Sequence, residues 1–320
     1  METTELALFT RGVRDAAASA TGAELDAALG DLGWHDALAA DDRAAVSVLF
    51  ECQGAANVTS SALDRVLGGA LGLAADPRSA PVVLPALGEV APPGAVSGGH
   101  LLVRGLALGA VTSHPHAVVV APAGNGDYEA VAVPLSALTV RAVDGLDPEL
   151  GLHEVSGDVQ TAAGPSLGRL DWEGAVALGQ LALGYELLGA GRTMLELARQ
   201  HALDRVQFGR PIGSFQAVRH RLAESLVALE AAAALLDAAW EDPATYAAMA
   251  KSFTGRQVRV AARHCQQVLA GIGFTTEHPF HRFLRRTIVL DQLLGAGTAL
   301  TRRLGADVLA TGSLPPAFAL

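Results

Sequence analysis

The chain has 320 residues, of which 50% are hydrophobic and 18% charged, with a formal net charge of −10. This apolar content excludes a disordered chain and is enough for one large core or two to three smaller ones. An acidic chain also lacks the basic face that a general nucleic-acid binder needs.

Two cysteines and the absence of a long apolar run bear on where the protein works. Cys52 and Cys265 are far apart and lack metal-ligand spacing, so a disulfide framework is excluded and the thiols fit a reducing cytosol. No apolar run reaches bilayer length, and the acidic N-terminus, residues 1–5, is not a secretory signal. We therefore expect a cytoplasmic protein without a membrane or nucleic-acid partner.

The first region, residues 1–76, reads as a helical domain. It is rich in Ala and Leu and poor in proline. Over residues 41–73, apolar side chains recur at intervals of three and four, which is the period of a helix with one buried face.

The second region, residues 77–169, reads as a small β domain. Its many prolines exclude long helices. Short apolar runs at 101–103, 117–120 and 130–133 predict strands. The pair Asn125-Gly126 between the last two runs predicts a tight hairpin turn.

The third region, residues 170–320, predicts four amphipathic helices packed as an antiparallel bundle. The expected helices cover 171–202, 214–240, 244–269 and 282–310. Asp242 before Pro243 is the expected N-cap of the third helix. The expected fold class is therefore α+β, mainly α, with a helical domain, a β domain and a four-helix bundle in that order.

The segment RVQFGRPIGSFQAVRHRLAE, residues 205–224, joins the first two bundle helices. Gly209 and Pro211 are expected to end one helix, and Ser214 to cap the next. Arg205 falls in the last helical turn, where its charge favours the helix dipole. Read alone, the segment is an ordinary turn between helices with a solvated arginine.

This segment resembles the corresponding turn of the acyl-CoA dehydrogenase family. A second segment, QVLAGIGFTTEHP at 267–279, is similar to another block of the same family, and the spacing of the two also fits. The resemblance implies the three-part fold and an FAD that lies between two subunits. It also implies that a carboxylate removes the α-proton of an acyl-CoA thioester while the flavin accepts the β-hydride.

The resemblance also assigns dinucleotide contacts in the neighbouring subunit's site. The matching positions are Arg205, Gln207, Phe208, Phe215, Gln216, Gln267 and Gly271. Arg205 would supply charge to the pyrophosphate, Phe208 an apolar face, and Gly271 a close backbone approach. Read alone, Gln267 is a capping or solvated amide.

The chain departs from the family where the catalytic base is expected. Counting from the second block places Leu294 there, and the alternative position on the first bundle helix is Gly179. The nearest acids are Asp291, Glu186 and Glu173, none at the expected position. The flavin-ring segments correspond to 87–92 and 101–104, which lack the family's hydroxyl and aromatic side chains.

These departures predict a subunit without its own base, so no catalytic residue is assigned. The expected function is to complete the FAD site of a catalytic partner in a heteromeric acyl-CoA dehydrogenase. Within the family such heteromers oxidise steroid side-chain thioesters. The alternatives are a self-sufficient homodimer that uses Asp291, Glu186 or Glu173, and a non-enzymatic scaffold of the same fold.

Three other clusters favour ordinary structural roles. His114 with His116, and His278 with His281, are pairs without a third ligand, so no metal site is expected. The arginines at 282, 285 and 286 read as a solvated or salt-bridged helix face.

Overall fold

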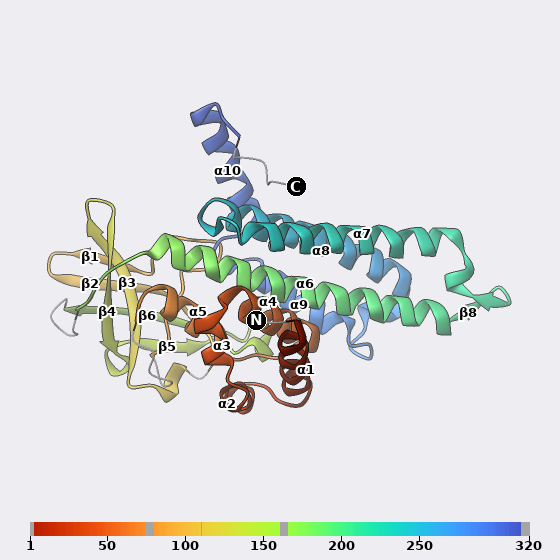
Figure 1. Cartoon of the computed structure of the whole chain (residues 1–320), viewed down its shortest axis with the longest axis horizontal. Helices are drawn as coiled ribbons and strands as arrows, with labels where there is room; N and C mark the ends of the chain where they lie inside the picture. Colours follow the sequence, from red (N-terminus) through yellow and green to blue (C-terminus); the bar gives the residue numbers. More distant parts are fainter. Residues whose placement is uncertain (1–2, 74–79, 110, 161–165, 315–320) are drawn as a thin grey trace. The chain divides into compact units, whose positions relative to one another are not determined.

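The computed structural model describes residues 3–73, 80–109, 111–160 and 166–314, and combines long helices with antiparallel sheets (Figure 1). The predicted class, α+β and mainly α, is confirmed. The chain forms two compact units. Unit 1 comprises Met1–Ala45, Val58–Gln180 and Gln292–Ala296, and unit 2 comprises Val46–Asn57, Leu181–Asp291 and Gly297–Leu320. The domain boundaries predicted after residues 76 and 169 remain predictions.

Unit 1 begins with short helices. They are α1 (Thr3–Ser19), α2 (Ala23–Asp31), α3 (Trp34–Ala40) and α5 (Ala62–Ala70). Leu25, Leu29 and Trp34 are at most 2% exposed, which places the helical core between α2 and α3. The indole N–H of Trp34 donates to the carbonyl of Ala45 at 3.0 Å, so the ring is held in one orientation.

Two antiparallel sheets complete unit 1. One has the strand order β1 (Gly94–Ser97), β2 (His100–Ala107), β6 (His153–Gln160) and β5 (Thr139–Ala142). The other has the order β3 (His116–Gly124), β4 (Asp127–Pro134) and β7 (Ser166–Leu170). Alternate residues of both sheets, among them Leu101, Val119 and Val155, form one buried cluster.

The predicted hairpin is confirmed between β3 and β4. Asn125 has φ of 55° and Gly126 of 83°, the two consecutive positive φ angles of a type I′ turn. The strand register pairs Gly124 with Asp127, so the turn has two residues.

Asp64 on α5 is buried and accepts the backbone N–H of Val82 at 3.1 Å. Burial raises the pKa of Asp64 to about 7, and this hydrogen bond opposes the rise only in part. Because the unfolded carboxyl has a pKa near 4, the folded state binds the extra proton between about pH 4 and pH 7. The free energy of unfolding is therefore expected to fall as pH rises through this window, by at most about 1.4 kcal/mol per pH unit.

Urea titrations of wild type and Asp64→Asn at several pH values from about 5 to 7 test this expectation. Asparagine keeps an acceptor for Val82 and cannot titrate, so its unfolding free energy should lose this slope. Asp36→Asn, an exposed site in the same unit, should keep it. Equal slopes in Asp64→Asn and wild type would contradict the assignment.

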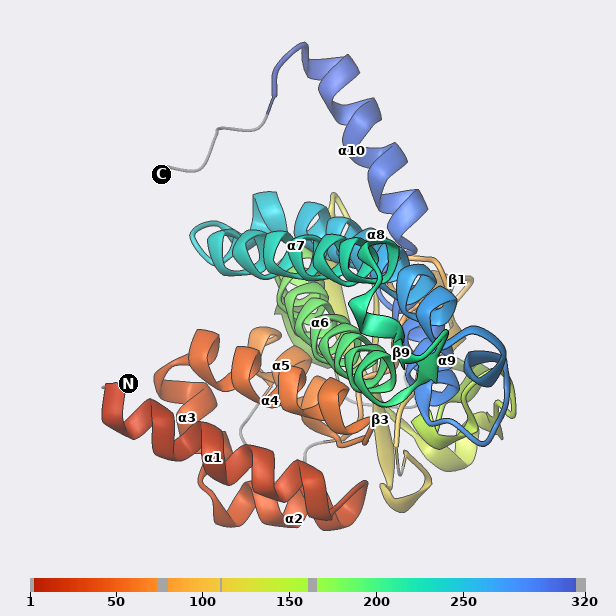
Figure 2. The same ribbon diagram turned by 90° about the vertical axis from the view of Figure 1, so that its right-hand side faces the viewer.

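Unit 2 contains the long helices. They are α6 (Trp172–Asp204), whose first nine residues belong to unit 1, α7 (Gln216–Ala239), α8 (Pro243–Leu269), α9 (Phe280–Leu290) and α10 (Gly297–Thr311). Figures 1 and 2 show α6, α7 and α8 lying side by side. The second part of α4 (Asp42–Ala56) also belongs to this unit. The first three predicted bundle helices are confirmed, each within a few residues.

The predicted fourth helix over 282–310 is wrong as one element. It is broken between α9 and α10, where Leu294 and Gly295 have φ angles of 51° and 102°. Positive φ is incompatible with a right-handed helix, so the chain must turn here. Residues 292–296, which lie at this break, belong to unit 1.

The two predicted caps have different outcomes. Asp242 accepts the backbone N–H of Thr245 at 3.3 Å with Pro243 in the first turn, so this N-cap is confirmed. Ser214 does not cap α7, because its hydroxyl donates to the carbonyl of Pro211 at 2.7 Å within a 3₁₀ turn. Phe215 takes the N-cap position instead, without a side-chain hydrogen bond.

Helices α4 and α6 pack backbone to backbone within unit 2 at two glycines. A Cβ on Gly54 would overlap the carbonyl oxygen of Glu186 and lie 2.8 Å from its carbonyl carbon. A Cβ on Gly189 would in the same way overlap the carbonyl oxygen of Glu51. Neither helix can carry a side chain at these two contacts.

Among the helices of the described residues, none is long and apolar enough to cross a membrane.

Candidate functional site

An exposed β-hairpin after α6 carries most of the residues predicted to contact a dinucleotide. Strands β8 (Val206–Gln207) and β9 (Arg210–Pro211) are joined by Phe208 and Gly209, whose φ angles are 55° and 77°. This is a tight turn of the I′ type. Phe208 is 91% exposed, so the hairpin presents a phenyl ring to solvent at the end of the α6–α7 pair (Figure 1).

Aromatic and cationic side chains meet at this hairpin. The rings of Phe208 and Phe215 lie edge to face with their centroids 6.1 Å apart. The guanidinium carbon of Arg210 lies 4.3 Å from the centre of the Phe215 ring, a cation–π distance. Sequence reasoning missed Arg210, although its position two residues after Phe208 was a usable signal. The structure thus brings together Phe208 and Phe215, which were each predicted to contact the dinucleotide, and places a positive charge beside Phe215.

Arg205 lies directly after the last residue of α6 rather than in its last turn. Its N–H donates to the carbonyl of His201 at 2.9 Å, and its carbonyl accepts the N–H of Ile212 at 2.8 Å. The backbone is therefore fixed on both sides while the side chain is exposed. Burial and, second, the charge of Arg205 lower the pKa of His201. Gln207 and Gln216 are also exposed.

Gln267, near the end of α8, lines a separate cavity of about 450 Å³. The other lining residues are Arg221, Arg263, His264, Gln266, Ala270 and Phe274. Arg221 comes from α7 and Arg263 from α8, so two helices bring two cations to one opening. None of the hairpin residues is among this described lining.

Gly271 lies beside the same cavity in a 3₁₀ turn at Ala270–Phe274. A Cβ at Gly271 would meet no atom within 4 Å, so this chain does not itself require glycine there. Its role in close approach to a ligand stays a prediction.

The chemistry of these side chains is compatible with that of the diphosphate and adenine of FAD. Guanidinium groups such as those of Arg205, Arg221 and Arg263 pair with phosphate oxygens, and an exposed phenyl ring gives a planar base a face to stack on. The diphosphate and adenine have this chemistry.

The two positions that the resemblance gives for the catalytic base lie against each other in unit 1. A Cβ on Gly179 would lie 2.5 Å from a methyl carbon of Leu294 and 3.0 Å from one of Leu67. Leu294 is fully buried, and its carbonyl accepts the side-chain amide of Gln180 at 2.9 Å. Hydrocarbon therefore fills both positions that the resemblance gives for the carboxylate.

The proposed flavin-ring segment is part of strand β2. Leu101 and Val103 point into the sheet core at 1% and 3% exposure, while Leu102 and Arg104 are exposed. The alternation is that of an ordinary half-buried strand. The outward residues offer neither an aromatic ring nor a hydroxyl to a flavin.

Two of the three acids considered as displaced bases, Asp291 and Glu186, are buried and pair with arginines. Asp291 is buried, its carboxylate pairs with Arg259 at 2.8 Å, and its backbone carbonyl accepts from Lys251 at 3.0 Å. Burial lowers the pKa of Lys251 to about 8 despite the attraction of Asp291. Glu186 faces Arg286 at 3.8 Å, with both side chains at most 3% exposed. Each of these carboxylates is thus held by an arginine.

Glu173, the third acid, lies exposed in the first turn of α6. It precedes Gly179 by six residues, or about 9 Å along the helix axis. A general base must come within hydrogen-bond reach of its proton, so Glu173 does not replace a carboxylate at Gly179.

Within the ranges that the structure describes, no group of three or more His, Cys, Asp or Glu side chains is placed to hold a metal ion.

Comparison with known proteins gives both sequence and structural matches. A family model described as acyl-CoA dehydrogenase, C-terminal domain, matches residues 172–309. Acyl-CoA dehydrogenase IpdE2 of Mycolicibacterium smegmatis is 31% identical over 212 residues, which are 65% of this chain and 66% of that protein. The matched part therefore spans just under two thirds of this relative's length.

Solved structures match over nearly the whole chain. The ChsE4–ChsE5 complex of Mycobacterium tuberculosis contains a chain with a TM-score of 0.77 and 23% identity, covering 99% of both chains. A variant of the Tcur3481–Tcur3483 steroid ACAD has a TM-score of 0.75 and 21% identity, covering 97% of this chain and 98% of that one. At these identities the structural matches establish the fold.

Proposed function

The chain belongs to the acyl-CoA dehydrogenase family, and on that premise we propose that it is a non-catalytic subunit of a heteromeric acyl-CoA dehydrogenase. In this assembly it completes the FAD site of a catalytic partner, which binds the acyl-CoA and carries the base. Bound FAD would supply the hydride acceptor for α,β-dehydrogenation of the thioester. We place this assembly in the cytoplasm.

The observation that carries the proposal is the pair Leu294 and Gly179. A base must reach the proton that it removes, and this chain has packed hydrocarbon at both family positions for it. The exposed hairpin with Arg205 and Phe208 is meanwhile retained, and it is the half-site expected to serve a neighbour. The hairpin is therefore suited to binding a neighbour's FAD, whereas the surroundings of Gly179 and Leu294 provide no base for proton removal.

The similar structures support the proposed classes of partner and substrate. One is the complex of ChsE4 with ChsE5, and another is a steroid ACAD. We propose a complete acyl-CoA dehydrogenase chain as the partner and a bulky, steroid-type acyl-CoA thioester as the substrate.

The test is the visible absorption spectrum of the full chain, purified alone and after co-expression with a complete acyl-CoA dehydrogenase chain. The chain alone should be colourless and inactive, and the complex should carry flavin and oxidise acyl-CoA. One flavin per chain with turnover in the chain alone would overturn the proposal in favour of a homodimer. A complex without flavin would favour a scaffold.

Arg205→Ala is expected to weaken flavin binding by the complex about 10- to 100-fold, because a charge-assisted contact to phosphate contributes about 1.5–3 kcal/mol. Flavin titration of the stripped complex, followed by fluorescence, measures this loss. Arg199→Ala is the matched control, since Arg199 is an exposed arginine near the end of the preceding helix α6 and pairs with Glu196 at 2.6 Å. Equal flavin affinity in both variants would contradict the role of Arg205.

A further inference from the structure

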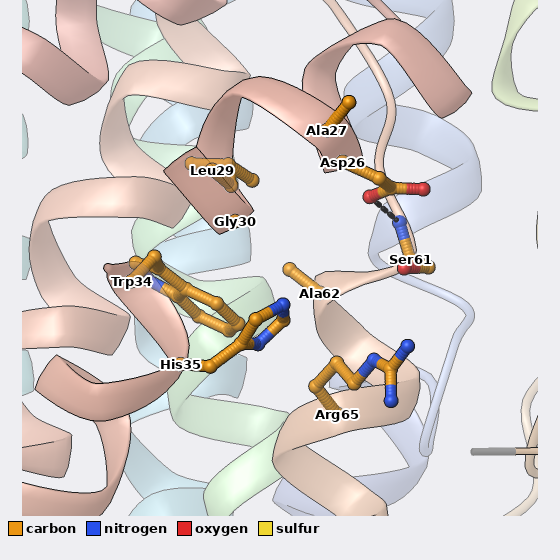
Figure 3. Close-up of a pocket in the computed structure, with 9 residues that line it drawn as sticks. All are labelled: Asp26, Ala27, Leu29, Gly30, Trp34, His35, Ser61, Ala62 and Arg65. Atoms are coloured by element: carbon orange, nitrogen blue, oxygen red, sulfur yellow. Dashed lines mark hydrogen bonds between the residues drawn. The ribbon is translucent and has the colours of Figure 1, made fainter. Parts of the chain in front are cut away.

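Two cavities of similar volume differ in the surface that they offer a ligand. The first, of about 410 Å³, lies in unit 1 among α2, α3 and the start of α5 (Figure 3). Leu29, Trp34 and Ala62 line it but are at most 2% exposed, and Arg65 is engaged in an interaction of its own. The second is the cavity of Gln267 in unit 2, whose cations and aromatic ring are exposed. The second cavity therefore has charged and aromatic surface with which to bind a ligand.

Arg221 on α7 and Arg263 on α8 bring two positive charges to this second cavity. Both side chains are exposed, and neither guanidinium has a hydrogen bond or an ion pair within the part of the chain that the structure describes. Arg259 on the same helix α8 differs, because it pairs with Asp291 at 2.8 Å. In a chain with a net charge of −10, two unpaired arginines at one opening favour an anionic ligand.

His264 also lines this cavity, but its ring nitrogens face groups of α7. Its Nδ1 lies 3.3 Å from the hydroxyl oxygen of Ser225, and its Nε2 lies 3.8 Å from the carboxylate of Glu224. Glu224 is not part of the described lining, and its single negative charge is opposed by the two arginines. The groups that remain for an anion are therefore the two guanidiniums.

Phe274 adds an aromatic face to the same opening. Its ring is 75% exposed at the end of the 3₁₀ turn Ala270–Phe274. The backbone N–H and the hydroxyl of Thr275 both donate to the carbonyl of Ile272, at 3.1 and 2.9 Å, and so fix this turn. An adenine can stack on an exposed phenyl ring, and the side-chain amide of Gln267 can pair with the polar edge of the base.

The chemistry of this cavity distinguishes the two common flavin cofactors. FAD consists of FMN joined to an AMP group, which adds a phosphate and an adenine. Guanidinium groups pair with phosphate, and an aromatic ring stacks on adenine. The volume of about 450 Å³ lies within the range of about 300–1,000 Å³ that small-molecule sites occupy. The cavity is therefore compatible with the part of FAD that FMN lacks.

We propose that Arg221 and Arg263 make the flavin site of the complex specific for FAD over FMN, by binding the phosphate of the AMP group while Phe274 stacks on its adenine. This inference rests on the proposed function, in which the catalytic partner holds the flavin ring. The family resemblance assigns none of these three residues. The subunit without a base would then be the one that chooses the cofactor.

Flavin titration of the stripped complex, followed by fluorescence, tests the selection. Arg221→Gln and Arg263→Gln should each weaken FAD binding about tenfold and leave FMN binding unchanged, because each removes one charge-assisted contact to phosphate. A merely structural role would weaken the binding of both flavins. Arg219→Gln is the matched control and should change neither affinity. Arg219 is exposed on the same helix, about 200° around its axis from Arg221, and is not part of the described lining.

ADP is the probe for the full chain without its partner, and equilibrium dialysis is the measurement. We expect saturable binding with a Kd on the order of 1 mM, because only one side of the site is then present. Adenosine, which lacks the phosphates, should not bind saturably. The double variant Arg221→Gln with Arg263→Gln should weaken ADP binding about tenfold or more, whereas Arg219→Gln should not.

The outcomes separate this inference from the proposed function. The selection is overturned by a lack of saturable ADP binding up to about 10 mM, by equal FAD affinity in Arg221→Gln and Arg219→Gln, or by equal losses of FAD and FMN binding. In each of these cases the proposed function stands if the complex still carries flavin and oxidises acyl-CoA. A complex without flavin overturns the proposed function, and the selection with it.

Discussion

Gly54→Ala is expected to lower the free energy of unfolding by about 3 kcal/mol or more. The added methyl would overlap the backbone carbonyl of Glu186, which no rotamer change can move. Relief requires α4 and α6 to separate, and the matching contact of Gly189 with the backbone of Glu51 would then loosen as well. Urea unfolding followed by circular dichroism would measure the loss.

Gly30→Ala is the control for this substitution. Gly30 lies inside α2, and a Cβ there would meet no atom within 4 Å. Alanine also has the better helix propensity, so this variant should be unchanged or more stable by about 0.5–1 kcal/mol. Equal midpoints for the two variants would show that the α4–α6 contact is not as close as described.

Arg286→Ala is expected to cost about 3–5 kcal/mol of stability, since removing one partner leaves a buried charge uncompensated. Arg286 on α9 is fully buried and faces Glu186 on α6, which is also buried. The midpoint of urea unfolding and the melting temperature should both fall. Replacing both partners, as Arg286→Met with Glu186→Leu, should recover most of the loss because neither charge of this pair then remains buried.

Arg285 gives a matched comparison on the same helix. It is exposed, so Arg285→Ala should change stability by no more than about 0.5 kcal/mol. If Arg286→Ala were as mild as Arg285→Ala, the buried pair would not contribute as argued.

The elements that sequence reasoning located are those with a strong local signal. Helical periodicity gave the first three long helices, and Asn125-Gly126 gave the hairpin, because the turn needs two positive φ angles. The fourth helix failed since the apolar spacing of Leu290, Leu293 and Leu294 continues through the break. Only the glycines at 295 and 297 mark it, and isolated glycines do not by themselves end a helix.

The arginine cluster of α9 also shows that the sequence pattern did not predict the burial of each single residue. It was expected to form one solvated or salt-bridged face. Arg282 and Arg285 are exposed, but Arg286 is fully buried on the face of Phe283 and Leu290. The helical spacing of 283, 286 and 290 was the available signal.

The candidate site was predictable only where a motif carries it. The family resemblance gave Arg205 and Phe208, but not the cations that share the opening with Gln267. Arg221 and Arg263 come from different helices, and nothing in their local sequence links them. The contact of Gly179 with Leu294 likewise joins residues more than a hundred positions apart. Contacts between residues so far apart in the sequence depend on the fold and cannot be predicted from the local sequence pattern.

Because residues 292–296 belong to unit 1, this unit cannot complete its folding early in translation. Within that unit, Gly88 donates to the carbonyl of Gln292 at 2.9 Å, and Gln180 donates to that of Leu294 at 2.9 Å. A ribosome adding about 5–20 residues per second leaves Gln180 waiting on the order of ten seconds for its acceptor. The part of unit 1 up to Gln180 must therefore persist without these two hydrogen bonds until residues 292–296 have been synthesised.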